Sequence, residues 1–577
     1  MIRHLGENRW LVLDTLAIAT GLAGGLGAVV FRRLAEAVHH FFFGPVLAAL
    51  PGGDGRLVLL PVLGGLVIGL SILRFAPEAK GEGIPELMES LHKKGGRIRA
   101  RSGPALLLAS AVTIGSGGSA GRDSPIAQIG ASFGSLLGQR LRLTVADVQI
   151  LAICGFVAGL AGTFNAPLGS AIFGMEVVMR RFRMVDAVPI LLSAVIGAAT
   201  ASTFLGQNPA FTPPETDLVL AELWLCFVLG LAFGIFSLLW VGLASGAERL
   251  FEWLPLRDGL KPALGGFVAG AVGLYFLDYG VMGVGYDGVD RVLNLVSSST
   301  GDEVQVLLFL LALATAKALA TASTLGSGGS GGSIAPTLYI GAVVGAALGL
   351  IFGDLLPVAE GHAPTYALLG AGALFAGSAG APLTCVVMIS EMTADYSLLP
   401  SLMIACATSY AIATIGLKGS TMYTLKLLRR GVSLEAGETV LERVLVEDAM
   451  AREVVAVAPE MTIREVRDEI VEHNIRGFPV VKDGELLGII TFDDLRKVPE
   501  ERQDEIRVED MAVKEVIVAY PDENMKQVMD RLYQNNIGRL PVVERTDPKK
   551  LLGMVTRTDA ISAYEMAAEK EGKELRR

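Results

Sequence analysis

Two glycine-rich stretches of the chain have the residue types and spacing of an anion site. They read GSGGSAGRDSP from Gly115 to Pro125 and GSGGSGGSIAP from Gly326 to Pro336. The first turn of a helix tolerates the proline that ends each stretch, because its missing N–H has no partner there. A helix N-terminus directs free backbone N–H groups and about half a positive charge outward, so it attracts anions without a lysine or arginine. The two stretches therefore predict two helix N-termini that bind an anion together.

The elements that carry these stretches are expected to be membrane helices. Of the 577 residues, 51% are hydrophobic and only 19% are charged, and the mean hydropathy of +0.51 is too high for a soluble protein of this size. Uncharged runs near or above the roughly 18 to 20 residues needed to span a membrane cover residues 15–31, 57–73, 187–214, 223–245 and 397–417. Glycine-broken helices at membrane depth are tolerated where they line a water-filled path, which favours a transporter or channel.

The chain changes character near residue 430. We predict a membrane part over residues 1–430, a linker over 431–444 and a charged tail in which helix and strand alternate. By the positive-inside rule, cationic segments at Leu425–Gly431, Arg180–Arg183 and His92–Arg101 mark the cytoplasmic side, so the tail is expected in the cytoplasm. The amino terminus MIRHLGENRW lacks the pattern of a cleaved signal, and we expect the first span to be retained.

The membrane part contains an internal repeat. LLASAVTIGSGGS at residues 107–119 parallels LATASTLGSGGS at 319–330, and APL recurs with a glutamate ten residues after its alanine, at Ala166–Glu176 and Ala381–Glu391. This predicts a duplication with repeats over about residues 57–205 and 260–416; such repeats are often inverted around a central substrate. Close packing of small residues is the alternative explanation, but it does not account for the shared order of Ser, Gly and Pro.

The tail has a repeat of its own. HNIRGFPVVKDGELLGIITFDDL, from His473, parallels NNIGRLPVVERTDPKKLLGMVTRTDA, from Asn535, and G-x-x-T-x-x-D occurs in both. The tail thus resembles a tandem of CBS domains at residues 445–500 and 506–565, followed by a charged tail at 566–577. The resemblance implies binding of ATP, ADP or AMP, with the ribose on the aspartate and a phosphate on the threonine. The same residues could instead cap helices. They are Thr491, Asp494, Thr556 and Asp559.

Four ordered motifs make the membrane part resemble the chloride channel and antiporter (CLC) family. They are GEGIPE from Gly81, GRDSP from Gly121, GSIAP from Gly332 and MYTLKLL from Met422. The resemblance implies an α-helical polytopic membrane protein with an inverted internal repeat and broken helices, plus an α/β tandem CBS cytoplasmic domain. It further implies a homodimer in the lipid of the cell membrane, with one pathway per subunit for chloride or another monovalent anion, and no required cofactor.

Carried over position by position, the resemblance implies that backbone N–H groups and one phenol hydroxyl surround the anion. Such neutral donors lower the cost of burying an anion and still let it leave, as conduction requires. The implied anion-binding residues are Glu82, Gly83, Ile84, Pro85, Arg122, Ser124, Ser333, Ile334 and Tyr423.

The gate residue departs from the usual pattern of the family. The family's external gate is the glutamate of GREGP, whose carboxylate imitates the anion and swings away when it is protonated or displaced. Here the position is Asp123, followed by Ser124. Aspartate is shorter by one C–C bond, about 1.5 Å, so we expect it to close the mouth of the pathway without filling the inner site. Arg122 beside it could hold the carboxylate ionised.

Two further departures concern carboxylates. Val177 stands where proton-coupled members often carry a proton-transfer glutamate, and valine cannot relay a proton. The preceding Glu176 is duplicated in Glu391, which favours a structural role. Glu82 stands where chloride-preferring relatives commonly have serine. A carboxylate there would repel an anion, so it must face away, be protonated or act as a second gate.

These observations favour passive, or weakly proton-coupled, anion transport, with a chloride/proton antiporter as the alternative. A CBS-regulated divalent-cation transporter is an alternative of another class, but helix N-termini repel cations, which prefer oxygen ligands. We expect no enzyme, no metal site and no nucleic-acid partner, because the sequence contains no Ser/His/Asp arrangement, metal-ligand cluster or Walker loop. The four cysteines stand singly in apolar segments and are expected in the core: Cys154, Cys226, Cys385 and Cys406.

Overall fold

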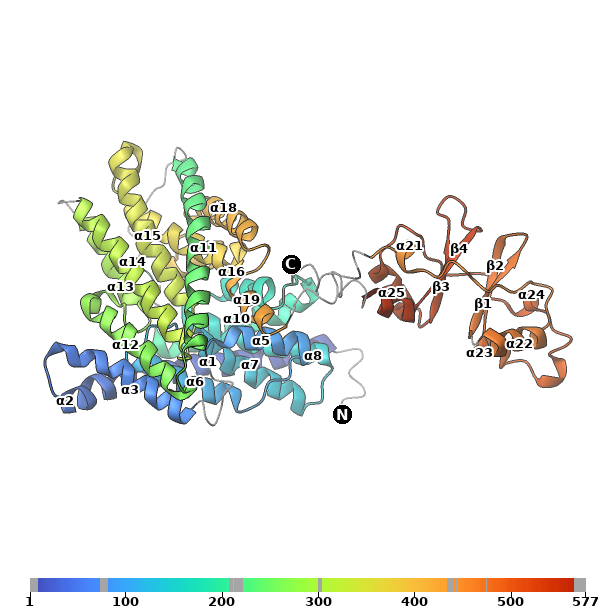
Figure 1. Cartoon of the computed structure of the whole chain (residues 1–577), viewed down its shortest axis with the longest axis horizontal. Helices are drawn as coiled ribbons and strands as arrows, with labels where there is room; N and C mark the ends of the chain where they lie inside the picture. The colour runs from blue at the N-terminus through green and yellow to red at the C-terminus, as the bar shows by residue number, and fades with distance from the viewer. Residues whose placement is uncertain are drawn as a thin grey trace. The chain divides into compact units, whose positions relative to one another are not determined.

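Helices of very different lengths make up the amino-terminal part of the chain (Figure 1). The structure, a computed structural model, describes residues 9–72, 81–206, 211, 222–298, 303–432, 441, 444–473 and 475–564. It divides into two compact units, Met1–Val432 and Ser433–Arg577. The first, called the helical unit below, carries the glycine-rich loops, and the second is the tail.

The first half of the helical unit runs from a long amino-terminal helix to the helix that follows the first APL motif. Its α-helices are α1 (Arg9–Phe41), α2 (Leu47–Ala49), α3 (Leu59–Val67), α5 (Gly83–Lys93), α6 (Ser102–Gly115), α7 (Asp123–Arg140), α8 (Val145–Phe164), α9 (Pro167–Phe173) and α10 (Met184–Leu205). A π-helical turn, Gly174–Val178, extends α9.

The second half likewise begins with a long helix and continues past the helix that follows its APL motif to one further short helix. Its α-helices are α11 (Leu223–Trp253), α12 (Lys261–Gly273), α13 (Tyr286–Ser298), α14 (Glu303–Gly326), α15 (Ile334–Leu355), α16 (Ala363–Ala379), α17 (Pro382–Thr393), α18 (Leu399–Gly416) and α19 (Met422–Arg429). Equivalent pairs pack together in both halves, since α7 lies against α8 as α15 lies against α16, and α1 against α10 as α11 against α18.

Eight helical stretches in the described residues are long and apolar enough to cross a membrane. Four of the five uncharged runs contribute to them, through α1, α10, α11 and α18. The run at 57–73 does not form one long helix. Instead it contains the end of a 3-10 turn, Asp54–Val58, then the nine-residue α3 and a π-helical turn, Ile68–Ile72. The predicted polytopic helical fold class is confirmed.

Each glycine-rich loop ends in a helix N-terminus, as predicted. Helix α7 begins at Asp123 and α15 at Ile334, so Pro125 and Pro336 lie in their first turns. The APL motifs also begin helices, because Pro167 opens α9 and Pro382 opens α17. All four cysteines are buried free thiols.

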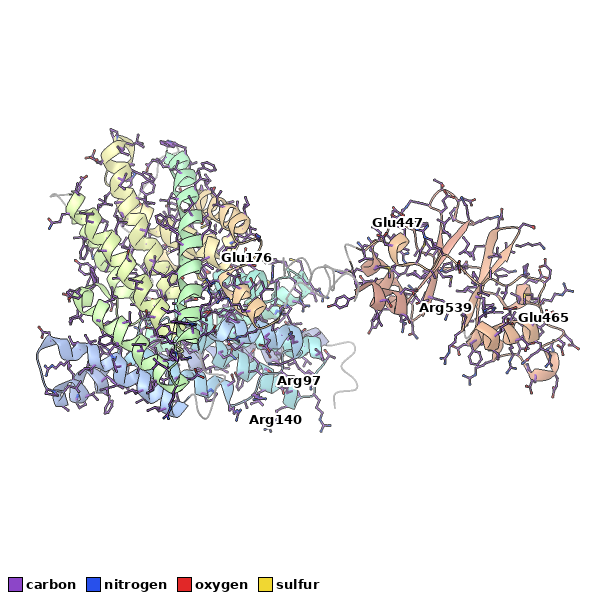
Figure 2. All side chains as sticks on the ribbon, in the orientation of Figure 1. Arg97, Arg140, Glu176, Glu447, Glu465 and Arg539 are labelled. Carbon is purple, nitrogen blue, oxygen red and sulfur yellow. The ribbon has the colours of Figure 1, made fainter. Side chains whose placement is uncertain are left out.

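The tail consists of two modules of similar construction. In chain order, the first has α21 (Val446–Ala449), α22 (Ile463–His473), β1 (Gly477–Lys482), β2 (Glu485–Thr491) and α23 (Phe492–Leu495); the second has α24 (Val508–Met511), α25 (Met525–Gln534), β3 (Arg539–Val543) and β4 (Leu551–Thr556). The strand pairs β1–β2 and β3–β4 are antiparallel hairpins, as the repeated PVV and GII or GMV segments predict. Arg539 joins the modules by donating to the carbonyl of Gly477 at 2.7 Å (Figure 2).

Candidate anion site

The two glycine-rich loops bond to each other where their helices begin. The N–H of Gly121 donates to the carbonyl of Gly332 and the N–H of Gly332 to that of Gly121, both at 2.7 Å. Two other kinds of bond are exchanged in the same way. One serine of each loop donates its N–H to a threonine of the other half: Ser119 to Thr324 (3.2 Å) and Ser330 to Thr113 (3.1 Å). The hydroxyls of the same serines bond further hydroxyls there: Ser119 that of Thr321 (2.9 Å) and Ser330 that of Ser110 (2.9 Å). This reciprocity is expected of halves related by a local two-fold axis.

Asp123 reaches from one loop to the other. Its side chain is fully buried at the start of α7, and Oδ2 accepts from the backbone N–H of Ile334, the first residue of α15, at 3.4 Å. The hydroxyl of Ser124 lies 3.5 Å from the same oxygen. A Cβ on Gly121 or Gly332 would overlap the carboxylate, so these positions leave just enough room for it. The carboxylate therefore occupies the place where the α15 N-terminus would receive an anion.

Two buried hydroxyls, those of Ser333 and Tyr423, lie near this carboxylate and interact with each other. Neither the Ser333 Oγ nor the Tyr423 Oη makes a well-formed hydrogen bond within the described part of the chain. Tyr423 lies in the first turn of α19, which is fixed by reciprocal bonds between Thr421 and Thr424, and its ring stands edge-on to Phe173, 6.3 Å between centroids. Buried hydroxyls are normally satisfied, so this pair marks a place for a ligand that accepts hydrogen bonds.

A third helix N-terminus faces the same loops. Helix α5 begins at Gly83, and Gly83, Ile84 and Pro85 are buried in its first turn. The carbonyl of Gly81 accepts from the N–H of Gly331 at 3.2 Å, which ties the start of α5 to the second loop. The predicted anion-binding backbone positions of α5, α7 and α15 are thus close together, although they are far apart in the sequence.

Cavities lie on two sides of this group. One of about 580 Å³, the Arg122 cavity, is lined by Arg122, Tyr286 and Asp287 among others. The guanidinium of Arg122 lies over the Tyr286 ring, 4.9 Å from its centroid, and its Nε makes no hydrogen bond to a described residue. Another of about 250 Å³, the Lys426 cavity, adjoins a third of about 30 Å³ that reaches Ser333.

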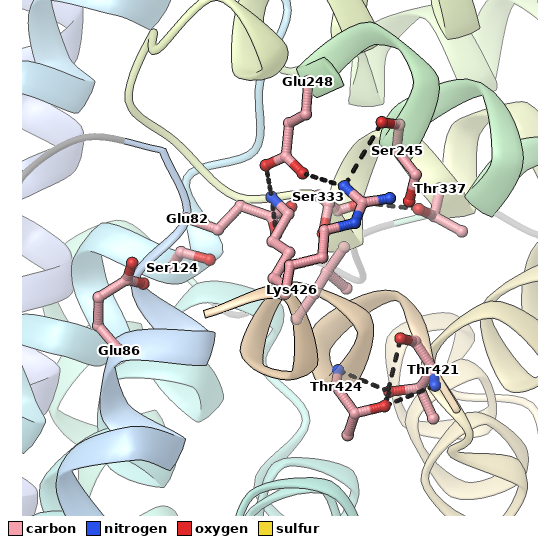
Figure 3. Close-up of polar contacts among 12 residues, drawn as sticks. Glu82, Glu86, Ser124, Ser245, Glu248, Ser333, Thr337, Thr421, Thr424 and Lys426 are labelled. Atoms are coloured by element: carbon pink, nitrogen blue, oxygen red, sulfur yellow. Dashed lines mark hydrogen bonds and ion pairs between the residues drawn. The ribbon is translucent and has the colours of Figure 1, made fainter. Parts of the chain in front are cut away.

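Glu82 has a partner that the motifs did not reveal. Its carboxylate lies 3.1 Å from Nζ of Lys426, which also lies 2.8 Å from the carboxylate of Glu248 (Figure 3). None of the three states expected for Glu82 included a cationic partner, whereas the structure pairs its carboxylate with Lys426. Lys426 follows Tyr423 by one helical turn of α19, and no spacing in the sequence relates it to Glu82.

Glu176, which belongs to the helical unit (Figure 2), and Val177 line a cavity whose walls do not contain Asp123, Ser333 or Tyr423. Val177 is buried. Glu176 accepts from the backbone N–H groups of Leu383 and Thr384 at 3.1 and 2.8 Å and from the Thr384 hydroxyl at 2.6 Å. These three donors satisfy the carboxylate at the start of α17, which suits a helix cap better than a proton relay.

In the tail, each predicted threonine is bonded to its predicted aspartate. The hydroxyl of Thr491 donates to Asp494 at 2.6 Å, and that of Thr556 to Asp559 at 2.7 Å. Burial works to raise the pKa of Asp494, but Lys497, 2.8 Å away, and the two Thr491 donors outweigh it and hold that pKa below its usual range. Both pairs cap helix starts, whichever ligand they also bind.

Comparison with known proteins shows similarity over both units. The family model described as voltage gated chloride channel matches residues 64–414, and the CBS domain model matches residues 446–501 and 508–565. The chain is 34% identical to a putative chloride channel protein ClcB-like of Ralstonia nicotianae, covering 69% of this chain and 93% of the relative. It is 30% identical to the H(+)/Cl(-) exchange transporter ClcA of Yersinia pseudotuberculosis, covering 73% and 88%. A solved slow cyanobacterial Cl−/H+ antiporter superposes with a TM-score of 0.64 at 26% identity, covering 72% of this chain and 97% of that one.

Proposed function

The chain belongs to the voltage-gated chloride channel (CLC) family, and from this premise we propose that it carries chloride or a similar monovalent anion across the cell membrane, passively or with weak proton coupling. Members of this family are multi-pass membrane channels and transporters, and a CBS tail, where a member has one, is cytoplasmic. Because α19 leads into the tail, the Lys426 cavity opens toward the cytoplasm in this proposal and the Arg122 cavity toward the outside.

One observation supports this function above others. The hydroxyls of Ser333 and Tyr423, which make no well-formed hydrogen bond to a described residue, lie buried near a carboxylate that accepts from the N–H of Ile334. A site that offers hydrogen-bond donors and helix N-termini, with a carboxylate in the anion's place, binds an anion that displaces the carboxylate. Asp123 is then the gate, and protonation or displacement of its side chain opens the pathway.

Weak proton coupling follows from two residues. Val177 has no ionisable group, and the carboxylate of Glu176 is occupied by backbone and hydroxyl donors of α17. Tight exchange needs a group that takes up and releases a proton on the cytoplasmic side. Neither residue supplies one readily.

A chloride/proton antiporter is the second candidate. It is favoured by the exchange transporters among the similar proteins and by a cavity of about 260 Å³ lined by Glu176, Val177 and Tyr410. Water in this cavity would give protons a route that needs no glutamate at position 177. The antiporter and the passive transporter share the same anion site and differ in this route.

The tail and a second subunit complete the proposal. We propose that an adenine nucleotide binds at Thr491, Asp494, Thr556 and Asp559, and that two chains form a dimer. Three of the described spans leave most of their residues exposed. Only 33% of the most apolar part of α18 is buried, and 39% of that of α10 and of Asp258–Tyr279. Exposed apolar side chains on α10 and α18 include Val188, Val195, Met403 and Ile415. Such a face suits another protein or lipid.

The deciding experiment is chloride flux from proteoliposomes with simultaneous recording of internal pH. Passive transport dissipates a chloride gradient with little or no proton movement. Uphill proton pumping at a fixed ratio to chloride identifies the antiporter instead. Flux of magnesium but not chloride would contradict the anion function altogether.

A further inference from the structure

Six charged side chains lie beside the Lys426 cavity, four of them joined in one network and two in a separate pair. Figure 3 shows the contacts of Lys426 with Glu82 and Glu248. The three cations all come from α19 and the segment just after it, and the three carboxylates come from the start of α5 and from α11. The pairs are Lys426 with Glu82 (3.1 Å) and Glu248 (2.8 Å), Arg429 with Glu248 (3.4 Å) and Arg430 with Glu86 (2.8 Å). The formal charges of the network cancel.

Among these six side chains, the pair of Lys426 and Glu82 is the most buried. The Glu82 side chain is 2% exposed and that of Lys426 18%, whereas Arg429 and Arg430 are 35% and 48% exposed. In the described part of the chain, Lys426 is the only ion-pair partner of Glu82. A carboxylate this far from water depends on its counter-charge much more than a surface carboxylate does.

The same pair borders the route to the anion site. Glu82 and Lys426 both line the small cavity of about 30 Å³, whose wall also contains Ser333. Glu82 is the residue directly before α5, whose first turn faces the loops. An anion that moves between the Lys426 cavity and the hydroxyls of Ser333 and Tyr423 therefore passes this pair.

We propose that Lys426 is the positioning residue that makes Glu82 compatible with anion passage. It neutralises the carboxylate and holds it in the network with Glu248, away from the hydroxyls that receive the anion. An unpaired carboxylate there would repel an entering anion strongly, because little water screens it. The inference rests on the proposed anion function and assigns the cytoplasmic entrance of that pathway to one ion pair.

A cycle of four proteins tests this assignment: the parent, Lys426→Met, Glu82→Ser and the double variant, each measured for initial chloride flux at neutral pH. Methionine keeps most of the length of the lysine stem. We expect Lys426→Met to lose about tenfold or more of the parental rate, Glu82→Ser to stay within about threefold of it, and the double variant to regain most of the loss. If Lys426 acted independently of Glu82, the effects of the two substitutions would add and the double variant would not regain flux.

Arg429→Gln is the matched control. It removes a cation from the same helix that pairs with Glu248 and not with Glu82, so its flux should stay near the parental rate. Size-exclusion profiles and thermal unfolding of every variant separate misfolding from slow transport. A folded Lys426→Met with parental flux, a double variant as slow as Lys426→Met, or an equal loss in Arg429→Gln would each overturn the inference.

The parent measurement keeps the two proposals apart. A parent that carries no monovalent anion contradicts the proposed function before any variant is compared. The inference about Lys426 is decided by the ratios among the four proteins, measured with an anion that the parent does carry.

Discussion

Glu176 and Glu391 cap each other's helices. Glu176, in the turn that extends α9, accepts from the first-turn N–H groups of Leu383 and Thr384 in α17, the helix that contains Glu391. Glu391 in turn accepts from those of Leu168 and Gly169 in α9, at 3.0 and 2.8 Å. A carboxylate at a helix N-terminus satisfies N–H groups that have no partner in the helix. The recurrence of APL with a glutamate ten residues after its alanine thus encodes an interlocking contact between the halves.

Removing either cap should lower stability without changing anion selectivity. Glu391→Ala loses two charge-assisted hydrogen bonds and Glu176→Ala loses three, each worth about 1.5 to 3 kcal/mol, so both should unfold at lower temperature, Glu176→Ala more so. Differential scanning fluorimetry in detergent, with chloride and nitrate flux on the same samples, measures both properties. A Glu176→Ala protein that melts like the parent but has lost proton movement would instead make Glu176 a relay.

Asp123→Ala should give anion flux that no longer depends on external pH. In the parent, protonation removes the charge that competes with the anion for the α15 N-terminus, so flux should rise as external pH falls. Alanine has no carboxylate to titrate, so its flux should already be high at neutral pH. Flux at a series of external pH values measures this, and a parental pH dependence in Asp123→Ala would show that another group is the gate.

Tyr423→Phe should weaken anion binding with little loss of stability, because the hydroxyl makes no well-formed hydrogen bond to the described residues. A hydrogen bond to an ion is worth about 1.5 to 3 kcal/mol, so the anion affinity should fall roughly tenfold or more. Tyr339→Phe is the control, since the Tyr339 hydroxyl donates to the carbonyl of Tyr279. It should lower the melting temperature and leave affinity unchanged. Calorimetric titration with chloride and bromide compares the two variants.

Gly332→Ala should be harmful only while Asp123 is present. The three atoms nearest to a Cβ on Gly332 all belong to the Asp123 side chain, so the added methyl group has to push the carboxylate out of its place. In an Asp123→Ala background the space is free, and Gly332→Ala should then be nearly neutral in stability. A double-mutant cycle on melting temperature measures the coupling, and additive effects would contradict the close approach.

Adenine nucleotide should bind the tail through the two threonine and aspartate pairs. Asp494→Ala also removes a helix cap, which costs about 0.5 to 2 kcal/mol. Loss of binding therefore counts only for protein that remains folded. Calorimetry on residues 440–577 with ATP, ADP and AMP, next to circular dichroism of Asp494→Ala and Asp559→Ala, is the measurement. Absence of heat with all three nucleotides in the folded parent tail would leave no nucleotide role for these pairs.

The sequence predicts the local features of the site better than its contacts. The two helix N-termini and their first-turn prolines follow from loop composition, and a structural role for Glu176 follows from its duplicate. The ion pair of Lys426 with Glu82 does not follow from the sequence, because the two residues are far apart in the chain and neither motif indicates a contact with the other. Arg122 is next to Asp123 in sequence, yet its guanidinium lies over Tyr286, since adjacent side chains at a helix start point in different directions.

The exchange of hydrogen bonds between Gly121 and Gly332 also bears on biosynthesis. A ribosome makes the chain from its amino terminus, so the first loop leaves it more than 200 residues before its partner loop exists. Until then the polar groups of residues 116–122 have no second loop to bond and must be hydrated or held by the insertion machinery. The anion site is consequently one of the last features of the helical unit that can form, and an interrupted translation product ending before residue 334 would insert helices into the membrane without any pathway between them.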